Sequence, residues 1–540
     1  MNPVTRLSPG RGLLLAAMLL GGAAVSHAST PVAAAESAAE KANTATGQRL
    51  YRQGIGASGE PITAIVTGDV AVLGSLFSCQ NCHGRSGMGT SEGTYLVPPI
   101  AARFLFAASA QPSRPAYDQK SLARALRTGV DPAGRALDPL MPRYLLADDE
   151  VAALAVYLQG LSTGPVPGVD DKVIRLATVI TDDVDVQQRD AVLAVLQTFV
   201  EEKNRQTRLE SERWNRGTTP ASKLPTLYRE WVLDVWNLSG PSSGWDKQLE
   251  SRYQRAPVFA MLGGLSAGSW SPIGRFCERH EIPCLFPATD LADAGATDFY
   301  TLYFSRGLDL EADLIMSHLG AHPVADVIQV YCTAAAARAA DTLRSALLQK
   351  GVSAENIGFA CDDALPAARL AARLAATPGA AVILWLRRDQ LAGLEQPLPA
   401  ARIYLSSTLL ERDLDAPLVS AVAPVFVAHP FRLPGESDSA MARFTVWART
   451  RGIEIRYPRL QAEAFFACFA TNDALNHVRR YLVRDYLLDS LDHAQALAVY
   501  VPVHPRATLG PGQRFLTKGG YLLPLVDGHA DSRNATWILP

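Results

Sequence analysis

Apolar runs of strand length alternate with amphipathic helical patterns from residue 173 to residue 386. The first pair is the run VIRLATVI at residues 173–180 and a helical pattern at residues 186–206. Further strands are predicted at 228–236, 257–264, 282–287, 325–332, 356–361 and 380–386, and helices at 245–255, 270–280, 309–320, 336–351 and 364–375. Strands that alternate with helices form parallel sheets covered by helices on both faces. Residues 172–540, about 370 in number, exceed one such sheet, so two α/β lobes are predicted.

The segment before this alternation has the composition of a domain linker. LSTGPVPGVDDK begins at residue 161 and is rich in proline and glycine, and we place the linker at residues 163–171. The whole chain has 48% hydrophobic and 19% charged residues, as ordinary globular proteins do. Its formal net charge of −2 shows no basic footprint of a nucleic-acid-binding protein.

The N-terminus has the three parts of a secretory signal. Arg6 and Arg11 precede an apolar run, and small residues end at Ala28. The run is too short to span a bilayer, although an uncleaved anchor is the alternative. We therefore predict a signal peptide over residues 1–28, cleaved near Ala28, and a periplasmic protein without a transmembrane segment. The Ala-rich residues 29–44 are predicted to form a flexible tether.

Cys79-Gln80-Asn81-Cys82-His83 matches the signature for covalent attachment of haem c. Two thiols three positions apart reach the two vinyl groups of a porphyrin, and the adjacent histidine becomes the proximal iron ligand. A thioredoxin-like dithiol would open a helix inside a βαβ unit, and no such unit surrounds Cys79. A zinc site needs two further ligands, but neither cysteine nor histidine occurs between His83 and Cys277.

A methionine is the expected sixth ligand of the iron, because it suits an electron carrier. Met88 lies five residues from His83, and such a short tether would have to round the macrocycle almost fully extended. Met141 lies 58 residues on, followed by Pro142, in a loop before a predicted helix. We therefore predict Met141 as the distal ligand; the alternative is that it only packs on the porphyrin.

Residues 45–162 resemble a small single-haem cytochrome c domain: a helix, CxxCH, a proline loop, a middle helix and a methionine–proline loop before the last helix. The resemblance implies a small all-α domain with one covalent haem c. It also implies that the loop at Pro98 and Pro99 contacts the haem and offers a carbonyl to the other nitrogen of His83. Residues 57–74 are longer than usual and suggest a small hairpin or a contact surface.

Export makes disulfide bonds possible for the remaining cysteines. Cys332 and Cys361 each end a predicted strand, and a bridge is feasible if the two strands are neighbours. Cys277 and Cys284 flank a short helix-to-strand turn and form a second possible pair. Free buried thiols are the alternative for both pairs. Cys468 lies in an apolar helical pattern and is predicted to be a core residue.

Residues 172–530 resemble the type I periplasmic solute-binding proteins, in particular the branched-chain amino-acid-binding group of ABC importers. The block PVFAMLGGLSAGSWSPIGRFCERHEIPCLFPATD carries the resemblance most specifically. The resemblance implies two α/β lobes hinged around a cleft whose loops hold a small organic ligand. Candidate ligand residues are Thr181, Asp182, Ser266, Ser269, Trp270, Ala288 and Thr289, with the turn at GGLSAGSW offering free N–H groups to a carboxylate.

We therefore expect an exported electron-transfer protein whose solute-binding-like domain recognises a small molecule or docks a redox partner. The resemblance to single-haem cytochromes implies a periplasmic dehydrogenase as that partner. The alternative is an ABC-type substrate-binding or sensing protein with an accessory haem domain. An oxidase or dehydrogenase would need an open position on the iron. The sequence contains none of the motifs with a Walker lysine, G-x-S-x-G or H-E-x-x-H, so no enzyme is expected.

Overall fold

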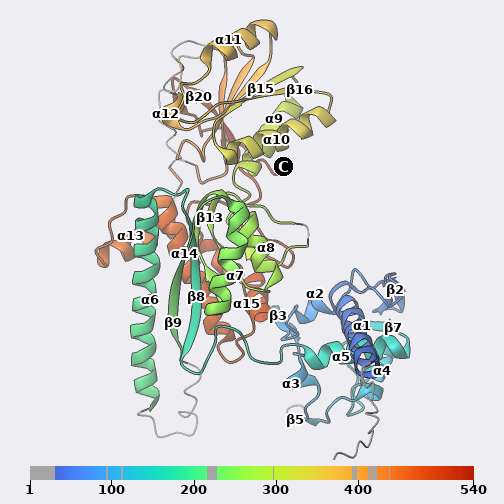
Figure 1. Cartoon of the computed structure of the whole chain (residues 1–540). Helices are drawn as coiled ribbons and strands as arrows, with labels where there is room; N and C mark the ends of the chain where they lie inside the picture. The colour runs from blue at the N-terminus through green and yellow to red at the C-terminus, as the bar shows by residue number, and fades with distance from the viewer. Residues whose placement is uncertain are drawn as a thin grey trace, which may run out of the picture.

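The computed structural model describes residues 31–92, 95–110, 113–215, 228–295, 297–391, 394, 398–411, 414, 423–433, 435–436 and 438–540. Figure 1 shows an N-terminal domain that lies beside the lower of two stacked α/β units. We call the lower unit, with strands β8 to β14, the first unit, and the upper one, with strands β15 to β21, the second unit. The predicted signal peptide, residues 1–28, lies outside the described residues.

The N-terminal domain is built around helices at its two ends. Its helices are α1 (Pro31–Gln53), α2 (Cys79–His83), α3 (Ala102–Leu105), α4 (Gln119–Thr128) and α5 (Asp148–Gly160). Helices α1 and α5 pack closely, since a Cβ atom at Gly47 would overlap the carbonyl oxygen of Ala153. Asp118 and Ser121 form a capping box at the start of α4, which sets where that helix begins. The core of the domain contains Leu50, Tyr51, Leu122, Leu126, Leu154 and Leu158.

The expected all-α fold of this domain is wrong, because a three-stranded antiparallel sheet lies beside the helices. Its order is β2-β1-β7, with β1 at Thr63–Val66, β2 at Val70–Leu73 and β7 at Arg143–Leu145. β-Branched residues favour these strands, and Gly68 and Asp69 turn the chain with positive φ angles of 83° and 58°. Two further pairs join β3 (Thr90–Glu92) to β4 (Tyr95–Val97) and β5 (Ser109–Ala110) to β6 (Ser113–Arg114).

The predicted flexible tether is also wrong from residue 31 onward, because α1 begins at Pro31 and continues to Gln53. Proline is favoured at the first position of a helix, and alanine has the highest helix propensity. The Ala-rich composition that suggested a tether therefore extends the first helix of the domain.

The first unit contains a seven-stranded sheet in the order β13-β11-β8-β10-β12-β14, with β9 paired to β8. Its strand pairs are all parallel, as the strand–helix alternation predicts. The strands are β8 (Val173–Thr181), β9 (Glu230–Leu238), β10 (Ala260–Leu262), β11 (Leu265–Ser269), β12 (Cys284–Leu285), β13 (Ala288–Leu291) and β14 (Thr301–Leu302). The helices of this unit are α6 (Val186–Asn215), α7 (Trp245–Arg255), α8 (Ser271–Arg279), α13 (Ser439–Thr450), α14 (Pro458–Val478) and α15 (Arg484–Asp492).

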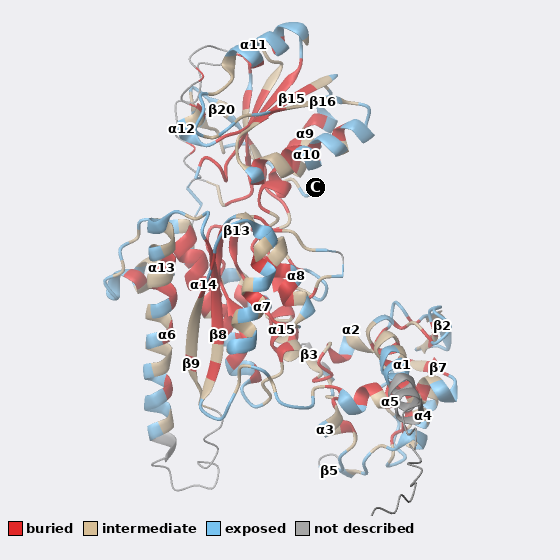
Figure 2. Cartoon of the chain, viewed as in Figure 1, coloured by how far each residue is buried: buried red, intermediate tan, exposed pale blue. Residues whose placement is uncertain are grey.

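The second unit has another seven-stranded sheet, in the order β16-β15-β17-β18-β19-β20-β21. The pairs from β16 to β19 are parallel, and the last two are antiparallel. Its strands are β15 (Asp326–Tyr331), β16 (Ser353–Gly358), β17 (Ala381–Trp385), β18 (Arg402–Ser406), β19 (Val425–His429), β20 (Tyr521–Val526) and β21 (His529–Ala530). Its helices are α9 (Leu308–Ala321), α10 (Ala334–Gln349), α11 (Ala367–Ala376) and α12 (Arg388–Leu391). Figure 2 shows buried residues concentrated along the sheet of each unit.

The chain crosses between the two units three times. It enters the second unit between β14 and α9, returns between β19 and α13, and enters again before β20. Among the residues that the structure describes, no helix has both the length and the apolar character that a membrane crossing requires.

Both possible disulfide bonds are present. Cys332 and Cys361 follow the neighbouring strands β15 and β16, and their Cα atoms lie 4.9 Å apart. Cys277 of α8 is joined to Cys284 of β12, with Cα atoms 6.4 Å apart. Cys468 is fully buried in α14, as predicted for a core residue.

Candidate functional site

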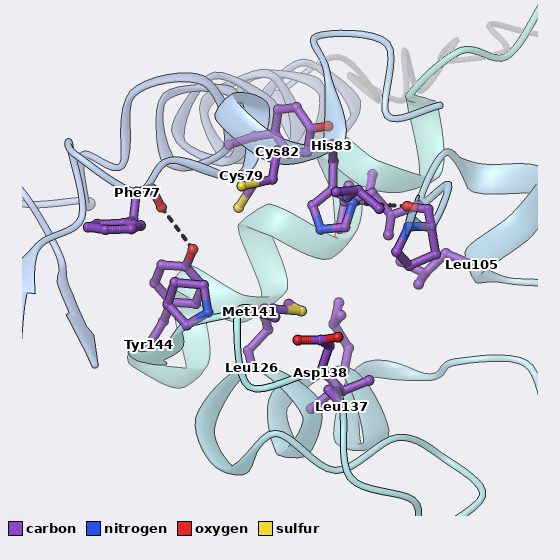
Figure 3. Close-up of a pocket in the computed structure, with 18 of the residues that line it drawn as sticks. Phe77, Cys79, Cys82, His83, Leu105, Leu126, Leu137, Asp138, Met141 and Tyr144 are labelled. Carbon is purple, nitrogen blue, oxygen red and sulfur yellow. Dashed lines mark hydrogen bonds between the residues drawn. The ribbon is translucent and has the colours of Figure 1, made fainter. Parts of the chain in front are cut away.

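The short helix α2 presents the CxxCH motif at the edge of a cavity in the N-terminal domain. The spacing of Cys79 and Cys82 places both sulfur atoms on the same side of this single turn, and Figure 3 shows them close together. The helix ends at His83, and the φ of 73° at the next residue, Gly84, lets the chain turn away sharply. The hydroxyl of Tyr51 donates a hydrogen bond to the Gly84 carbonyl over 2.7 Å and fixes that turn.

The cavity next to α2 has a volume of about 300 Å³, which we call the N-terminal cavity. This volume lies at the lower end of the range for ligand and cofactor pockets. Its walls are mainly apolar side chains, among them Leu122 and Leu126 of α4 and Leu154 and Leu158 of α5. Within the part of the chain described, no group of three or more histidine, cysteine or acidic side chains forms a separate metal cluster.

His83 projects into this cavity with a defined tautomer. Its Nδ1 lies 3.0 Å from the carbonyl oxygen of Pro98, the hydrogen bond that the resemblance implied. A carbonyl oxygen can only accept, so Nδ1 carries the proton and Nε2 keeps its lone pair. Burial lowers the pKa of His83, while the bond to Pro98 partly opposes this effect. The ring is therefore a neutral ligand for a metal centre.

Met141 lines the same cavity on the wall opposite His83 (Figure 3). The turn that holds it is closed by a hydrogen bond of 2.9 Å from the Met141 N–H to the Asp138 carbonyl. Met88, the closer methionine in sequence, is buried and does not belong to the cavity lining. Pro98 lines the cavity as well, whereas Pro99 follows it in the chain without doing so.

The two motif cysteines lack the features of a redox dithiol. Burial raises the pKa of the Cys79 thiol to about 12, whereas a reactive cysteine has a lowered pKa. The helix α2 also follows a loop and packs in a helical domain instead of leading from a strand into a βαβ unit. Two thiols for thioether bonds to the macrocycle, with an imidazole nitrogen and a methionine thioether as iron ligands on an apolar cavity, are the groups that a c-type haem requires.

A second candidate site lies where the two α/β units meet, and we call it the junction cavity. It is lined by Pro287 to Asp290 from the first unit, by Thr408 from the second, and by Arg459, Glu463 and His504. Its volume is about 20 Å³, close to what one water molecule needs and far below a typical ligand pocket.

Buried charged groups surround the junction cavity. Arg459 lies 3.7 Å from carboxylate oxygens of both Asp290 and Glu463, and His504 Nε2 lies 2.8 Å from Glu463. Glu311 of α9 accepts hydrogen bonds from the N–H and the hydroxyl of Thr408 at 2.9 and 2.8 Å. Burial raises the pKa of Glu311 to about 8. The ion pairs of Arg459 lie within the first unit, and the hydrogen bonds between Glu311 and Thr408 lie within the second.

We expected the candidate ligand residues at GGLSAGSW to lie in a turn, and this expected conformation is wrong. Gly263 and Gly264 turn the chain, after which residues 265–269 form β11 beside β13. Ser266 accepts a hydrogen bond from the Gly268 N–H, and Ser269 accepts one of 3.2 Å from Arg338 of the second unit. Trp270 is fully buried in the core. The local Gly/Ser composition suggested a turn, but pairing with β13 decides the conformation.

The other predicted ligand residues have internal partners too. Thr181 donates to Asp183, and Asp182 accepts a hydrogen bond of 2.7 Å from the Gly240 N–H. Ala288 and Thr289 form the start of β13 and line the junction cavity, with Thr289 donating to the Gly268 carbonyl over 2.8 Å. The structure thus brings only these last two to the junction cavity.

The sequence did not indicate three of the lining residues, Arg459, Glu463 and His504, because no local pattern marks them as neighbours of β13. A usable signal is Glu463 itself, since it is a charged residue inside the otherwise apolar pattern of α14. Buried charged residues of this kind are rarely unpaired.

Residues 74–162 match the family model described as Cytochrome c, so the expected cytochrome c region is confirmed over this range. The curated proteins contain no match to the chain.

Solved structures similar to the chain include a leucine-binding protein from Thermotoga maritima, with 11% identity, a TM-score of 0.44, and coverage of 68% of this chain and 99% of that one. A branched-chain amino acid ABC transporter protein from Thermus thermophilus with bound valine has 11% identity, a TM-score of 0.47 and coverage of 68% and 97%. A possible leucine/isoleucine/valine-binding protein from Rhodopirellula baltica has 10% identity, a TM-score of 0.45 and coverage of 69% and 98%.

Proposed function

We propose that this chain is an exported c-type cytochrome that transfers electrons through one covalently bound haem. The observation that carries the proposal is the N-terminal cavity, in which His83 and Met141 face each other from opposite walls (Figure 3). Cys79 and Cys82 lie at the edge of the same cavity, at the spacing required for two thioether bonds. The residues present therefore fit haem c.

Each residue then has a distinct task. Cys79 and Cys82 would hold the macrocycle, and the hydrogen bond from Nδ1 of His83 to the Pro98 carbonyl would leave Nε2 free to bind the iron. The Met141 thioether would supply a soft ligand, and the leucine side chains of the cavity would exclude water around it. Haem, when bound, supplies an iron that exchanges one electron at a potential that these groups set.

With both His83 and Met141 bound, the iron would have no open position for a substrate, so we propose an electron carrier and not an enzyme. Its redox partner is then a protein such as a periplasmic dehydrogenase, as the resemblance to single-haem cytochromes implies. A signal peptide over residues 1–28 accounts for delivery to the periplasm.

The test is the absorption spectrum of the full chain produced with covalent haem. The protein is expected to show the band of methionine-to-iron ligation, and Met141→Ala is expected to lose it. Met88→Ala is the matched control and is expected to retain the band, because Met88 lies outside the cavity lining. A band that survives in Met141→Ala would refute the ligand assignment, because another methionine would then bind the iron. A wild-type protein without the band would reopen an enzymatic role at a free iron position.

A second candidate function is that of a substrate-binding or sensing protein, in which the two α/β units act as lobes around a small organic solute. The charged lining of the junction cavity favours it. At about 20 Å³, this cavity admits such a solute only after the units move apart. Titration calorimetry with small organic solutes, read together with the reduction potential, tests this function. Solute binding without any shift of the potential would exclude redox-linked sensing.

A further inference from the structure

The loop that follows His83 is held by the first α/β unit and not by its own domain alone. Asp489 of α15 accepts hydrogen bonds from the backbone N–H groups of Arg85 and Ser86, at 3.1 and 2.9 Å. Asp489 is buried, although it lies 404 residues from Arg85 in the sequence. The two N–H groups belong to the second and third residues after the proximal histidine.

The side chain of Arg85 forms the second half of this contact. Its guanidinium lies over the ring of Phe299, 4.2 Å from the ring centroid, and its Nε lies 3.6 Å from Asp485. The hydroxyl of Tyr300 donates to the same Asp485 over 2.6 Å. Both ion-pair partners are about 15% exposed, so this pairing is screened far less than a surface ion pair.

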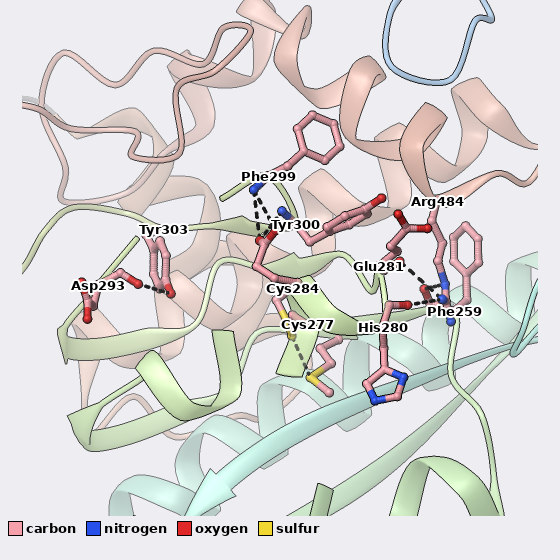
Figure 4. The surroundings of a disulfide bond; sticks show 12 residues. Phe259, Cys277, His280, Glu281, Cys284, Asp293, Phe299, Tyr300, Tyr303 and Arg484 are labelled. Atoms are coloured by element: carbon pink, nitrogen blue, oxygen red, sulfur yellow. Dashed lines mark hydrogen bonds between the residues drawn. A yellow bond between two sulfur atoms is a disulfide. The ribbon is translucent and has the colours of Figure 1, made fainter. Parts of the chain in front are cut away.

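The groups that hold the loop are themselves anchored in the first unit. Arg484 donates to the carbonyl oxygens of Phe259 and His280, each over 3.0 Å, and Figure 4 shows this arginine beside both residues. At the other end of α15, Asp492 accepts two hydrogen bonds from Arg514, which also donates to the Phe299 carbonyl. Helix α15 is therefore fixed at both ends.

The aromatic pair under Arg85 is anchored as well. Glu278 accepts hydrogen bonds from the N–H groups of Phe299 and Tyr300, and the preceding residue, Cys277, is bonded to Cys284 (Figure 4). The disulfide thus fixes the end of α8 that carries Glu278. The surface offered to Arg85 is rigid on both sides.

The carboxylate of Asp489 lies close to the backbone of the loop that follows His83. A Cβ atom on Gly84 would lie 2.6 Å from a carboxylate oxygen of Asp489. Gly84 directly follows His83, so the carboxylate rests on the peptide next to the proximal ligand. Only a residue without a side chain admits this contact.

We propose that Asp489 and Arg85 form an interdomain clamp that positions the His83 loop and sets the reduction potential of the haem with two opposite charges. Asp489 and Arg85 are positioning residues, because they act on the haem through the loop and its field. The inference rests on the proposed function. A buried negative charge near the iron favours the oxidised, more positive form, and a buried positive charge favours the reduced form.

The charge states agree with this assignment. Burial raises the pKa of Asp489 to about 6, and the N–H groups of the loop oppose the rise. Most of the carboxylate is therefore ionised at pH 7.5. The other charged groups at the interface are Asp485 and its two ion-pair partners, Arg85 at 3.6 Å and Arg52 at 4.0 Å.

The experiment measures the midpoint potential of the full haem-loaded chain by spectroelectrochemistry at pH 7.5. Asp489→Asn keeps the shape and removes the charge, so the potential is expected to rise by about 59 mV, which is a tenfold change in the equilibrium constant of a one-electron reduction. Arg85→Gln is expected to lower it. Asp190→Asn, which removes an exposed carboxylate of α6, is the control and is expected to leave the potential unchanged.

Potential shifts of opposite sign in Asp489→Asn and Arg85→Gln separate this mechanism from a loss of structure. A loosened loop would shift the midpoint potential of both variants in the same direction. A shift in Asp489→Asn no larger than the control, or equal signs in both variants, overturns the proposal. If Asp489→Asn does not fold, Arg85→Gln decides alone: a fall supports the clamp and an unchanged potential overturns it.

Hydrogen exchange at residues 84–86 provides a readout that does not depend on haem. The amides of Arg85 and Ser86 are expected to exchange faster in Asp489→Asn than in the wild type. Equal exchange overturns the clamp even where the haem spectrum confirms the cytochrome. A wild-type chain without covalent haem refutes the proposed function instead, and faster exchange in the variant then still supports the contact.

Discussion

Replacing Glu311 by glutamine is expected to change how the stability of the protein depends on pH. Glu311 has no exposed surface, and one of its oxygens accepts both hydrogen bonds from Thr408. Burial raises its pKa to about 8 from an ordinary value of 4.5, a nearby Asp290 adds to the rise, and the hydrogen bonds oppose it. The glutamine variant retains an acceptor for Thr408 and has no proton to exchange.

The sign follows from the order of the two pKa values. The folded chain binds the proton of Glu311 more tightly than the unfolded chain does, so protonation stabilises the fold. This contribution is complete below about pH 4.5 and is lost as the pH rises toward 8. A difference of about 3.5 between the pKa values corresponds to about 5 kcal/mol, and about 3 kcal/mol of it falls between pH 5 and pH 7.5.

The assay is urea unfolding of the full chain at pH 5.0 and 7.5. The free energy of unfolding of Glu311→Gln minus that of the wild type is expected to be about 3 kcal/mol larger at pH 7.5 than at pH 5.0, which means that the variant gains relative stability. Asp363→Asn, an exposed acid of the same unit, is the control, and its difference from the wild type is expected to be the same at both pH values. A Glu311→Gln difference that does not change with pH would show that Glu311 is ionised in the folded protein.

Two further substitutions probe the backbone and the covalent framework. Gly84→Ala is expected to lower the melting temperature more than Gly134→Ala, because both have positive φ but only Gly84 faces Asp489; equal losses would contradict the close approach. Replacing Cys332 and Cys361 by serine opens a loop of 29 residues and is expected to cost about 3 to 4 kcal/mol in urea unfolding; an unchanged urea midpoint would contradict this.

Features with a local signature could be predicted from the sequence. The strand–helix alternation predicts parallel sheets because the period and the length of each apolar run can be read from the sequence without knowledge of its tertiary contacts. The same pattern made a bond between Cys332 and Cys361 possible but left free thiols open, and the pairing of β15 with β16 decides for the bond. Met141 could be preferred over Met88 because tether length is a property of the chain alone.

Features that depend on pairing partners were predicted wrongly. Gly/Ser-rich residues 263–270 resemble a turn, yet residues 265–269 become a strand because β13 supplies their hydrogen-bond partners. The Ala-rich start of the chain resembles a linker, although a helix continues through it to Gln53. Propensity alone cannot separate these outcomes.

The contact between α15 and the loop that follows His83 had the weakest signature in the sequence. Asp485 and Asp489 lie four residues apart on one face of α15, between leucines that the core takes up. Such a pair is typical of a solvated helix face. Only the fold brings it to the loop after His83.

The contacts of α15 with the loop that follows His83 fix the proposed haem site relative to the first unit. The contacts of Arg85, Asp485 and Asp489 tie the N-terminal domain to the first unit, whereas the second unit joins that unit through three connections. A rotation of the second unit about these connections leaves every distance between haem and first unit unchanged. Under the proposed functions, electron transfer through the N-terminal domain would therefore be independent of any movement of the second unit that admits a solute.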